Sequence, residues 1–220
     1  MSPYCNKVRR CLNYKQLPFS VVNYNGLTAL KAGKLSPVGK LPVLDYDHER
    51  IQDSARIAEF LEQLHPNPPL LVKEPALRAQ LLLWEDWAGA SLYFHEIYFR
   101  MLDPESRAKA VDLVCAGRPR WERAVIDFVF RRRYPRKLRE QGLARLPPEE
   151  VERQFFALLA ALEQVLEGRD WLVGERLTLA DLGVVAQLDE LLRTSRLAPR
   201  VLAHPRIKGW IERCNALAPA

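Results

Sequence analysis

Apolar residues recur at two different spacings along the chain, and the change in spacing predicts two structural regions. In the first 65 residues, short helical patterns alternate with short runs that are rich in β-branched and aromatic residues. After residue 75, the apolar positions follow only the helical period, in long segments without strand candidates. The pattern predicts a small mixed α/β unit followed by an all-helical unit.

The first region is expected to begin with a helix, because Val8, Cys11, Leu12 and Lys15 follow the i, i+3, i+4, i+7 spacing before Pro18. The remaining elements are expected as strands at 18–24, 41–47 and 49–52, a brief helical turn at 27–33 and a helix at 53–65. The last two strands flank turn residues, so we expect them to form a hairpin.

Four prolines lie in residues 66–75, which predicts a linker between a domain at 1–65 and a domain at 76–220. In the second domain, helices are expected at 76–102, 121–134, 147–168, 177–193 and 204–217. The sequence contains no internal repeat. Because the second domain has a series of helices and no strand candidate, it is expected to be a helical bundle.

One helix start is marked especially clearly. Thr178 and Asp181 stand at the N-cap and N3 positions of a capping box, with Asp in place of the usual Glu or Gln. Leu177 and Leu182 are placed to form the accompanying hydrophobic staple. We interpret this motif as structural and not catalytic.

Composition narrows the class of protein only slightly. Of the 220 residues, 48% are hydrophobic and 27% are charged, which is ordinary for a globular protein. No uninterrupted apolar run approaches the ~20 residues that span a bilayer, and the N-terminus lacks an apolar signal region. We therefore expect a cytoplasmic protein with no membrane partner.

The formal charge of +6 is mild, but residues 118–139 hold nine basic residues against Glu122 and Asp127. An Arg-rich, solvated helix face explains this stretch, and an anion or nucleic-acid patch is the alternative. No nucleic-acid-binding motif accompanies the charge, so we do not expect a nucleic-acid partner.

Cysteine and histidine are too scattered for a disulfide framework or a metal site. The cysteines form no Cys-x-x-Cys pair and stand at Cys5, Cys11, Cys115 and Cys214. The histidines lack metal-ligand spacing and stand at His48, His65, His95 and His204. We expect reduced thiols and no metal cofactor.

Three separated segments carry a combined family pattern: SPYCNKVRRCLNYKQLPF, SPVGKLPVLDYDHERIQDSARIAEFLE and WLVGERLTLADLGVV. The first opens a helix with a Ser-Pro corner, the second joins Pro-x-Gly-Lys-x-Pro to an acidic-Ser pair, and the third is the capped helix. In this order and spacing they resemble the soluble glutathione transferase family over nearly the whole chain. The letters SPYC also resemble the glutaredoxin active-site tetrapeptide with its first Cys replaced by Ser.

The resemblance implies a thioredoxin-like domain followed by a helical domain, a homodimer, and glutathione as co-substrate. It implies a cis peptide between Leu41 and Pro42, with the Leu41 backbone pairing to the cysteinyl part of glutathione. It places Asp53 and Ser54 at the γ-glutamyl end and Lys40 near the glycyl carboxylate. The residues alone also allow plain helix caps at Asp53 and Ser54, a solvated Lys40 and an edge strand beginning at Pro42.

Two residues compete for the catalytic role. Ser2 matches the family's hydroxyl position, and its hydroxyl together with a helix N-terminus can stabilise the glutathione thiolate. Cys5, if exposed at the helix start, would instead form a mixed disulfide with glutathione. A small buried structural cysteine is the third interpretation of Cys5.

The electrophile site is expected against the helical domain, where relatives build it. An aromatic cluster on the helix at 76–102 is the candidate wall, and a core or dimer surface is the alternative role; its members are Trp84, Trp87, Tyr93, Phe94, Tyr98 and Phe99. The chain departs from the family at its start, because relatives carry an interior strand before the Ser-Pro corner. We expect either a later start than the natural one, a partner that fills the gap, or a degenerate domain.

The leading hypothesis is a glutathione-dependent transferase that activates the thiolate for attack on small hydrophobic electrophiles. A Cys5-centred thiol-disulfide oxidoreductase is the second hypothesis, and a non-catalytic interaction or stress protein with the same fold is the third. Isomerase chemistry on glutathione adducts also stays open.

Overall fold

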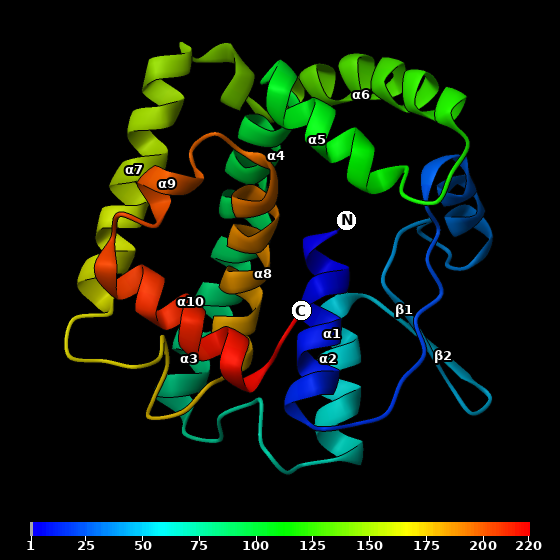
Figure 1. Cartoon of the computed structure of the whole chain (residues 1–220). Coiled ribbons are helices and arrows are strands. Elements are labelled where there is room, and N and C mark those ends of the chain that lie inside the picture. The colour runs from blue at the N-terminus through cyan, green and yellow to red at the C-terminus, as the bar shows by residue number, and fades with distance from the viewer. Residues whose placement is uncertain (1) are drawn as a thin grey trace.

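The computed structural model describes residues 2–220 as two packed regions (Figure 1). The first region contains α1 (Pro3–Tyr14), the 3₁₀ helix η1 (Gly26–Lys34), β1 (Val43–Tyr46), β2 (Glu49–Gln52) and α2 (Ser54–Leu64). The second region contains α3 (Pro75–Asp86), the π-helical turn η2 (Trp87–Leu92), α4 (Tyr93–Met101), α5 (Pro104–Val114), α6 (Arg120–Gln141), the 3₁₀ helix η3 (Leu143–Arg145), α7 (Pro148–Val165), α8 (Leu179–Thr194), α9 (Ala198–Val201) and α10 (Pro205–Leu217).

The expected hairpin is confirmed and has a defined register. Strands β1 and β2 are antiparallel, and Val43 pairs with Gln52 at the end of the ladder that lies farthest from the turn. Tyr46 pairs with Glu49 next to the turn, where Asp47 has a positive φ of 50°. An Asp tolerates this left-handed conformation better than most residues, which explains the tight connection.

The two helices of the first region lie side by side and run in the same direction (Figure 1). Just beyond the C-terminal end of α1, the buried Lys15 ammonium contacts Glu62 at 2.7 Å and the main-chain oxygens of His65 and Pro68 at 2.5 and 3.0 Å. These partners lie at and just beyond the C-terminal end of α2. Because α1 and α2 have 12 and 11 residues and run in the same direction, their N-terminal ends point to the same side of the region.

The strand expected at 18–24 is wrong. Residues 17–25 have no regular secondary structure, and the described residues form a sheet of β1 and β2 only. Most side chains of the segment are exposed, with Val22 at 74%. A β-rich composition favours extended backbone, but a strand also needs a neighbour for its ladder of hydrogen bonds, and none is described beside this segment.

Helix α8 is the centre of the second region, and its capping box is confirmed. Both oxygens of Asp181 are used: Oδ2 accepts from Thr178 N at 2.8 Å, and Oδ1 accepts from Leu172 N and Trp210 Nε1, each at 2.9 Å. Asp181 therefore joins the start of α8 to α10 and to the loop before α8. Leu177 and Leu182 are both buried, as expected for the two residues of the hydrophobic staple.

The remaining helices differ in part from the expected ones. The helix expected at 76–102 is interrupted by the π turn η2, and α6 runs through Pro135 to Gln141 instead of ending near residue 134. Helix α5 was not expected at all, because its apolar positions form only a weak stripe. It packs against α4 and α6.

Candidate functional site

The hairpin register brings two of the expected binding segments together. Pro42 precedes Val43, and Asp53 follows Gln52, so both flank the last residue pair of the ladder. Paired strands lie about 5 Å apart, so the loop before β1 and the turn after β2 leave the sheet side by side. The peptide bond between Leu41 and Pro42 is cis, as the resemblance implied.

Two helix starts converge at this end of the hairpin. Ser2 is the N-cap of α1, and its Oγ accepts a hydrogen bond from Cys5 N at 3.4 Å. Asp53 is the N-cap of α2, and its Oδ1 accepts from Ala55 N at 2.9 Å and from Arg56 N at 3.3 Å. Since the helices are parallel, the positive ends of both macrodipoles point to the same side of the region, which favours an anion there.

The caps leave polar capacity for a ligand. A serine hydroxyl that accepts from a main-chain N–H still has its own proton to donate. Asp53 uses only Oδ1 as a cap, and no hydrogen bond to its Oδ2 is present within residues 2–220. Ser54 is buried directly beneath the cap, whereas Lys40 is exposed and forms no ion pair with the described part of the chain. The hairpin thus brings the Leu41–Pro42 and Asp53–Ser54 segments together at the start of α2, and Ser2 caps the parallel helix α1.

Cys5 has the wrong electrostatics for a reactive thiolate. It is a free thiol in the first turn of α1, and burial raises its pKa, against the lowering influence of Ser2. A nucleophilic cysteine at neutral pH needs the opposite shift. The geometry therefore favours a structural Cys5 beside Ser2.

Tyr4 of the first region and Tyr93 of the second region form a wall of polar aromatic side chains where the two regions meet. Tyr4, two residues after Ser2, donates from its Oη to the Gly89 carbonyl oxygen at 3.1 Å, and its ring lies 5.4 Å from that of Tyr93. The π turn η2 holds Gly89, and such turns redirect main-chain groups away from the regular helical ladder. Lys137 Nζ donates to Tyr93 Oη at 2.9 Å and lies 4.6 Å above its ring.

A buried charge cluster supports this wall and was not predicted. The Arg100 guanidinium lies between two carboxylates, Glu96 Oε1 at 2.6 Å and Glu190 Oε2 at 3.3 Å. All three side chains are at most 4% exposed. Burial raises the pKa of Glu96 to about 8, Arg100 opposes that rise, and Glu190 adds to it. The i, i+4 spacing of Glu96 and Arg100 was visible in the sequence, but Glu190 comes from a distant helix.

The expected aromatic cluster divides between three environments. Tyr93 faces Tyr4 and lies 5.3 Å from the Phe94 ring, whereas Tyr98 and Phe99 belong to the buried core. Trp84 and Trp87 line an apolar groove of about 380 Å³ between α3 and α7, and neither Ser2 nor any other predicted glutathione-site residue lines it. The cluster is therefore not a single pocket wall.

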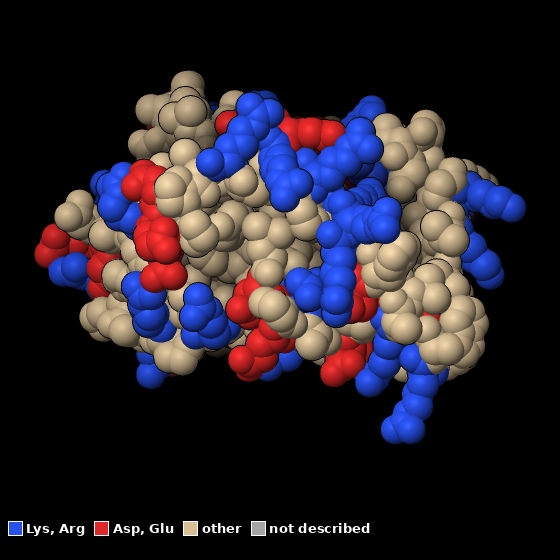
Figure 2. Space-filling view, turned by 90° about the horizontal axis from the view of Figure 1, so that it is seen from above, with Lys and Arg blue, Asp and Glu red and all other residues tan. Residues whose placement is uncertain are grey.

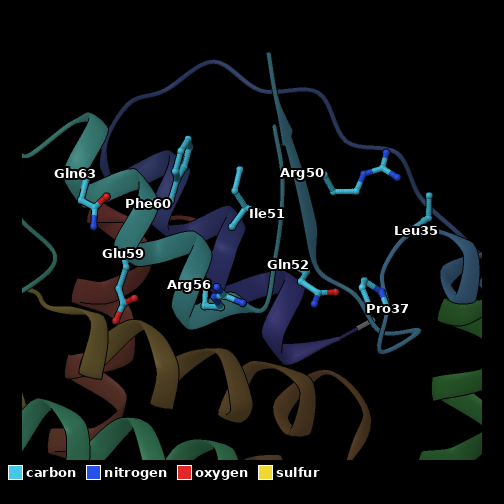
Figure 3. A pocket seen from close by; sticks show the side chains of 9 residues that line it. All are labelled: Leu35, Pro37, Arg50, Ile51, Gln52, Arg56, Glu59, Phe60 and Gln63. Carbon is cyan, nitrogen blue, oxygen red and sulfur yellow. The ribbon is translucent and has the colours of Figure 1, made fainter. Parts of the chain in front are cut away.

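A larger cavity of about 500 Å³ lies beside α2, on the face turned away from α1 (Figure 3). Leu35, Pro37 and Gln52 lie at one end of it, and Glu59 and Gln63 at the other. The Gln52 Oε1 atom is buried and has no hydrogen-bond partner within residues 2–220. Any molecule that fills this end of the cavity needs a hydrogen-bond donor there.

The described residues contain no group of three or more His, Cys, Asp or Glu side chains arranged to hold a metal ion. None of the helices between residues 2 and 220 is long and apolar enough to cross a membrane.

A thioredoxin-like region followed by a helical region, with two helix starts and a cis-proline loop converging between them, defines a class of glutathione-binding fold. Two family models match the chain: the glutathione S-transferase N-terminal domain over residues 1–69 and the glutathione S-transferase C-terminal domain over residues 129–218. Together they cover well over half of the sequence. The chain belongs to the glutathione S-transferase family.

Individual relatives are distant and differ in their names. The chain is 29% identical over 198 residues to FtsZ-localized protein A of Caulobacter vibrioides, covering 86% of this chain and 72% of that protein. It is 27% identical over 214 residues to maleylacetoacetate isomerase of Pseudomonas aeruginosa, covering 90% and 83%. A glutathione S-transferase structure from Methylobacillus flagellatus with glutathione bound is 21% identical, with a TM-score of 0.61 over 100% of this chain and 96% of that one.

Proposed function

We propose that the protein is a glutathione-dependent transferase that activates the glutathione thiol for attack on small hydrophobic electrophiles. The observation that carries the proposal is the position of Ser2, the Leu41–Pro42 loop and the Asp53–Ser54 turn at the N-terminal ends of two parallel helices, α1 and α2. Asp53 Oδ2 would accept from the γ-glutamyl ammonium, and the start of α2 at Ser54 would receive its carboxylate. Lys40 would pair with the glycyl carboxylate.

Ser2 would activate the sulfur. A thiol with a pKa of ~8.5 is about 3% ionised at pH 7, and a decrease of two units raises that fraction to about three quarters. A hydrogen bond to a charged group contributes roughly 1.5–3 kcal/mol, or about one to two pKa units. The Ser2 hydroxyl and the helix start therefore suffice. The thiol proton passes to water, the sulfur bonds to the electrophilic carbon, and the leaving group departs with the bonding pair.

The electrophile would lie between Ser2 and the wall formed by Tyr4 and Tyr93. These rings offer apolar faces, and the Tyr93 hydroxyl already accepts from Lys137. The Tyr93 hydroxyl can therefore donate its own proton to the electrophile. A carbonyl, nitro or halide group that gains negative charge during the attack is stabilised by such a hydrogen bond. Detoxification of reactive small molecules is the role that suits this chemistry.

We extend the proposal to a homodimer in the cytoplasm. The apolar groove between α3 and α7 and the exposed Leu82 and Leu83 beside it give a second copy a hydrophobic surface to cover. The four cysteines are free thiols, which suits a reducing compartment.

The test combines calorimetry with kinetics. Glutathione titrated into the protein should bind saturably below millimolar concentration, and a dinitrophenyl halide should be conjugated. Ser2→Ala should lower kcat/KM by roughly 10- to 100-fold, since one charge-assisted hydrogen bond is lost. Ser2→Thr should retain most activity, and Cys5→Ala is the matched control that should leave it unchanged.

Other outcomes select the other hypotheses. Activity that vanishes in Cys5→Ala but persists in Ser2→Ala would replace the transferase with a thiol-disulfide oxidoreductase. Absence of glutathione binding at millimolar concentration would leave a non-catalytic member of the family. Turnover of a glutathione adduct without net conjugation would indicate an isomerase.

A further inference from the structure

Helix α6 exposes apolar side chains on the face that points away from the protein. Trp121 is 60% exposed, Phe128 is 58% exposed, and Val125 and Val129 are nearly 40% exposed. Trp121, Val125 and Phe128 follow the i, i+4, i+7 spacing, so they form one stripe along the helix. The opposite face is buried through residues such as Ile126. The helix is therefore apolar on two sides, and the described chain covers only one of them.

The same helix carries most of the protein's net charge. It holds eight basic residues and three acidic ones, whereas the whole chain has a net charge of +6. Figure 2, which looks down on the side where α6 lies in Figure 1, shows Lys and Arg side chains gathered on this surface. Several arginines have no ion pair within residues 2–220: Arg120, Arg132, Arg133 and Arg139.

Apolar and basic residues are separated along the helix axis. The stripe of Trp121, Val125 and Phe128 occupies the first half of α6, and most of the arginines occupy the second half. Arg132 joins the halves, because its guanidinium lies 4.9 Å from the Phe128 ring centre. This stacking orients the guanidinium before any partner arrives.

The residue types are those of a protein interface. Seven of the eight basic residues are arginine, and the exposed apolar group includes a Trp and a Phe. Trp and Arg are enriched at the centres of protein–protein interfaces, while Lys is depleted there. Arginine also binds carboxylates through two parallel hydrogen bonds, which makes it specific for acidic side chains.

We propose that the outer face of α6 is a docking surface for an acidic, amphipathic helical segment of another protein. Apolar residues of that segment would pack on Trp121, Val125 and Phe128, and carboxylates near one of its ends would pair with Arg132 and Arg139, which continue the same stripe of the helix. The outer stripe of α6 does not include Lys137, the α6 residue that contacts Tyr93 at the candidate site, so docking and glutathione chemistry are separate properties.

The charge distribution argues against other occupants. A second copy of the chain would place two strongly basic helices together, which is repulsive. An anionic membrane would contact basic residues along the full helix, but here most of them lie in one half. Nucleic acid would use the arginines, yet it offers nothing for the Val125 and Val129 side chains.

The experiment measures the anisotropy of labelled probes with the full chain. The acidic probe is a helical peptide with leucines at i, i+4 and i+7 followed by glutamates. Two control peptides have the same sequence, with every glutamate replaced by glutamine in one and by lysine in the other. An oligothymidine and vesicles of phosphatidylcholine with phosphatidylglycerol are further probes. The acidic peptide should bind at least about tenfold more tightly than the glutamine peptide, and the lysine peptide should not bind.

Variants locate the binding on α6. Trp121→Ser with Phe128→Ser, and separately Arg132→Gln with Arg139→Gln, should each weaken binding of the acidic peptide by about tenfold or more. The matched control is Val22→Ser with Arg169→Gln, two exposed positions outside α6, and it should bind normally. Circular dichroism confirms that each variant is folded.

Four results would overturn the proposal. The first is equal binding of the glutamate and glutamine peptides, and the second is unchanged binding by both α6 variants. The third is tighter binding of the vesicles or the oligothymidine through the same residues. The fourth is self-association of the protein that is lost with Trp121→Ser and Phe128→Ser, which would assign the face to a second copy.

Discussion

The two regions of the molecule contribute polar groups to the site in opposite ways. The first region offers helix starts, short caps and a loop, with Asp53 exposed and Ser2 only partly buried. The second region offers a buried network of charged side chains around Arg100, each at most 4% exposed. Main-chain groups at the start of a helix are ready to receive a ligand, whereas buried charges hold one wall in place. Changes in the first region should therefore affect ligand binding, and changes in the second should affect stability.

The largest expected effect is on stability and comes from the second region. Asp181→Ala would leave the donors of Leu172, Thr178 and Trp210 without their acceptor. A buried donor that loses its partner costs about 1–3 kcal/mol, so the unfolding free energy should fall by roughly 3–5 kcal/mol in urea titration. The exposed Asp170→Ala is the control and should change stability little. Similar losses in both variants would mean that Asp181 does not organise this region.

The second largest expected effect is the pH dependence of the unfolding free energy that Glu96 causes. Burial raises the pKa of Glu96 in the folded protein to about 8. Between the unfolded pKa near 4.5 and this value, the native state binds more protons than the unfolded state, so stability falls as pH rises. The contribution of one group is at most about 1.4 kcal/mol per pH unit. Glu96→Gln should flatten this slope between pH 5 and 8.

Thermal unfolding of both proteins at several pH values measures the Glu96 effect. The exposed Glu105→Gln is a suitable control, because its side chain is 72% exposed. Parallel curves for the natural protein and Glu96→Gln would show that Glu96 does not titrate in this range.

A smaller effect on stability and a larger one on ligand binding are expected at Asp53. Asp53→Ala removes an N-cap, which costs about 1 kcal/mol. The same change removes the proposed acceptor for the γ-glutamyl ammonium, so glutathione affinity in calorimetry should fall by about tenfold or more. Asp53→Asn retains the cap and separates the two effects. Normal glutathione binding by Asp53→Ala would place the ligand elsewhere.

The smallest expected effect is at the contact between the two regions. Tyr4→Phe removes the hydrogen bond to the Gly89 carbonyl and should cost about 0.5–1.5 kcal/mol in unfolding free energy. Tyr14→Phe is the control, since no side-chain hydrogen bond of Tyr14 is present within residues 2–220. If both changes cost the same, the contact does not hold the regions together.

Features that depend on nearby residues could be predicted from the sequence. The hairpin, the helix after Asp53 and the capping box of Thr178 and Asp181 each follow from a short pattern of residues. The strand expected at 18–24 failed because a strand depends on a neighbour as well as on its own residues. Helix α5 was missed because the packing that stabilises it comes from α4 and α6.

In the candidate site, too, the features set by nearby residues could be predicted and those set by tertiary packing could not. The resemblance drew attention to Leu41, Pro42, Asp53 and Ser54, and the hairpin register explains why they meet. The buried cluster could not be predicted, because Glu190 lies more than 90 positions from Glu96 in the chain and reaches it only through tertiary packing. The division of the aromatic residues between core, groove and site wall has the same cause.

The ammonium of Lys15 has a consequence for chemistry at a distance. It joins α1 to α2 at their C-terminal ends, and a rise of ~1.5 Å per residue places this contact about 20 Å from Ser2. Without the Lys15 contacts, α1 could shift along α2 or rotate against it. Ser2 and Asp53, to which we assign the proposed activation of the sulfur and the proposed binding of the γ-glutamyl end, would then lose their alignment, although neither had been altered.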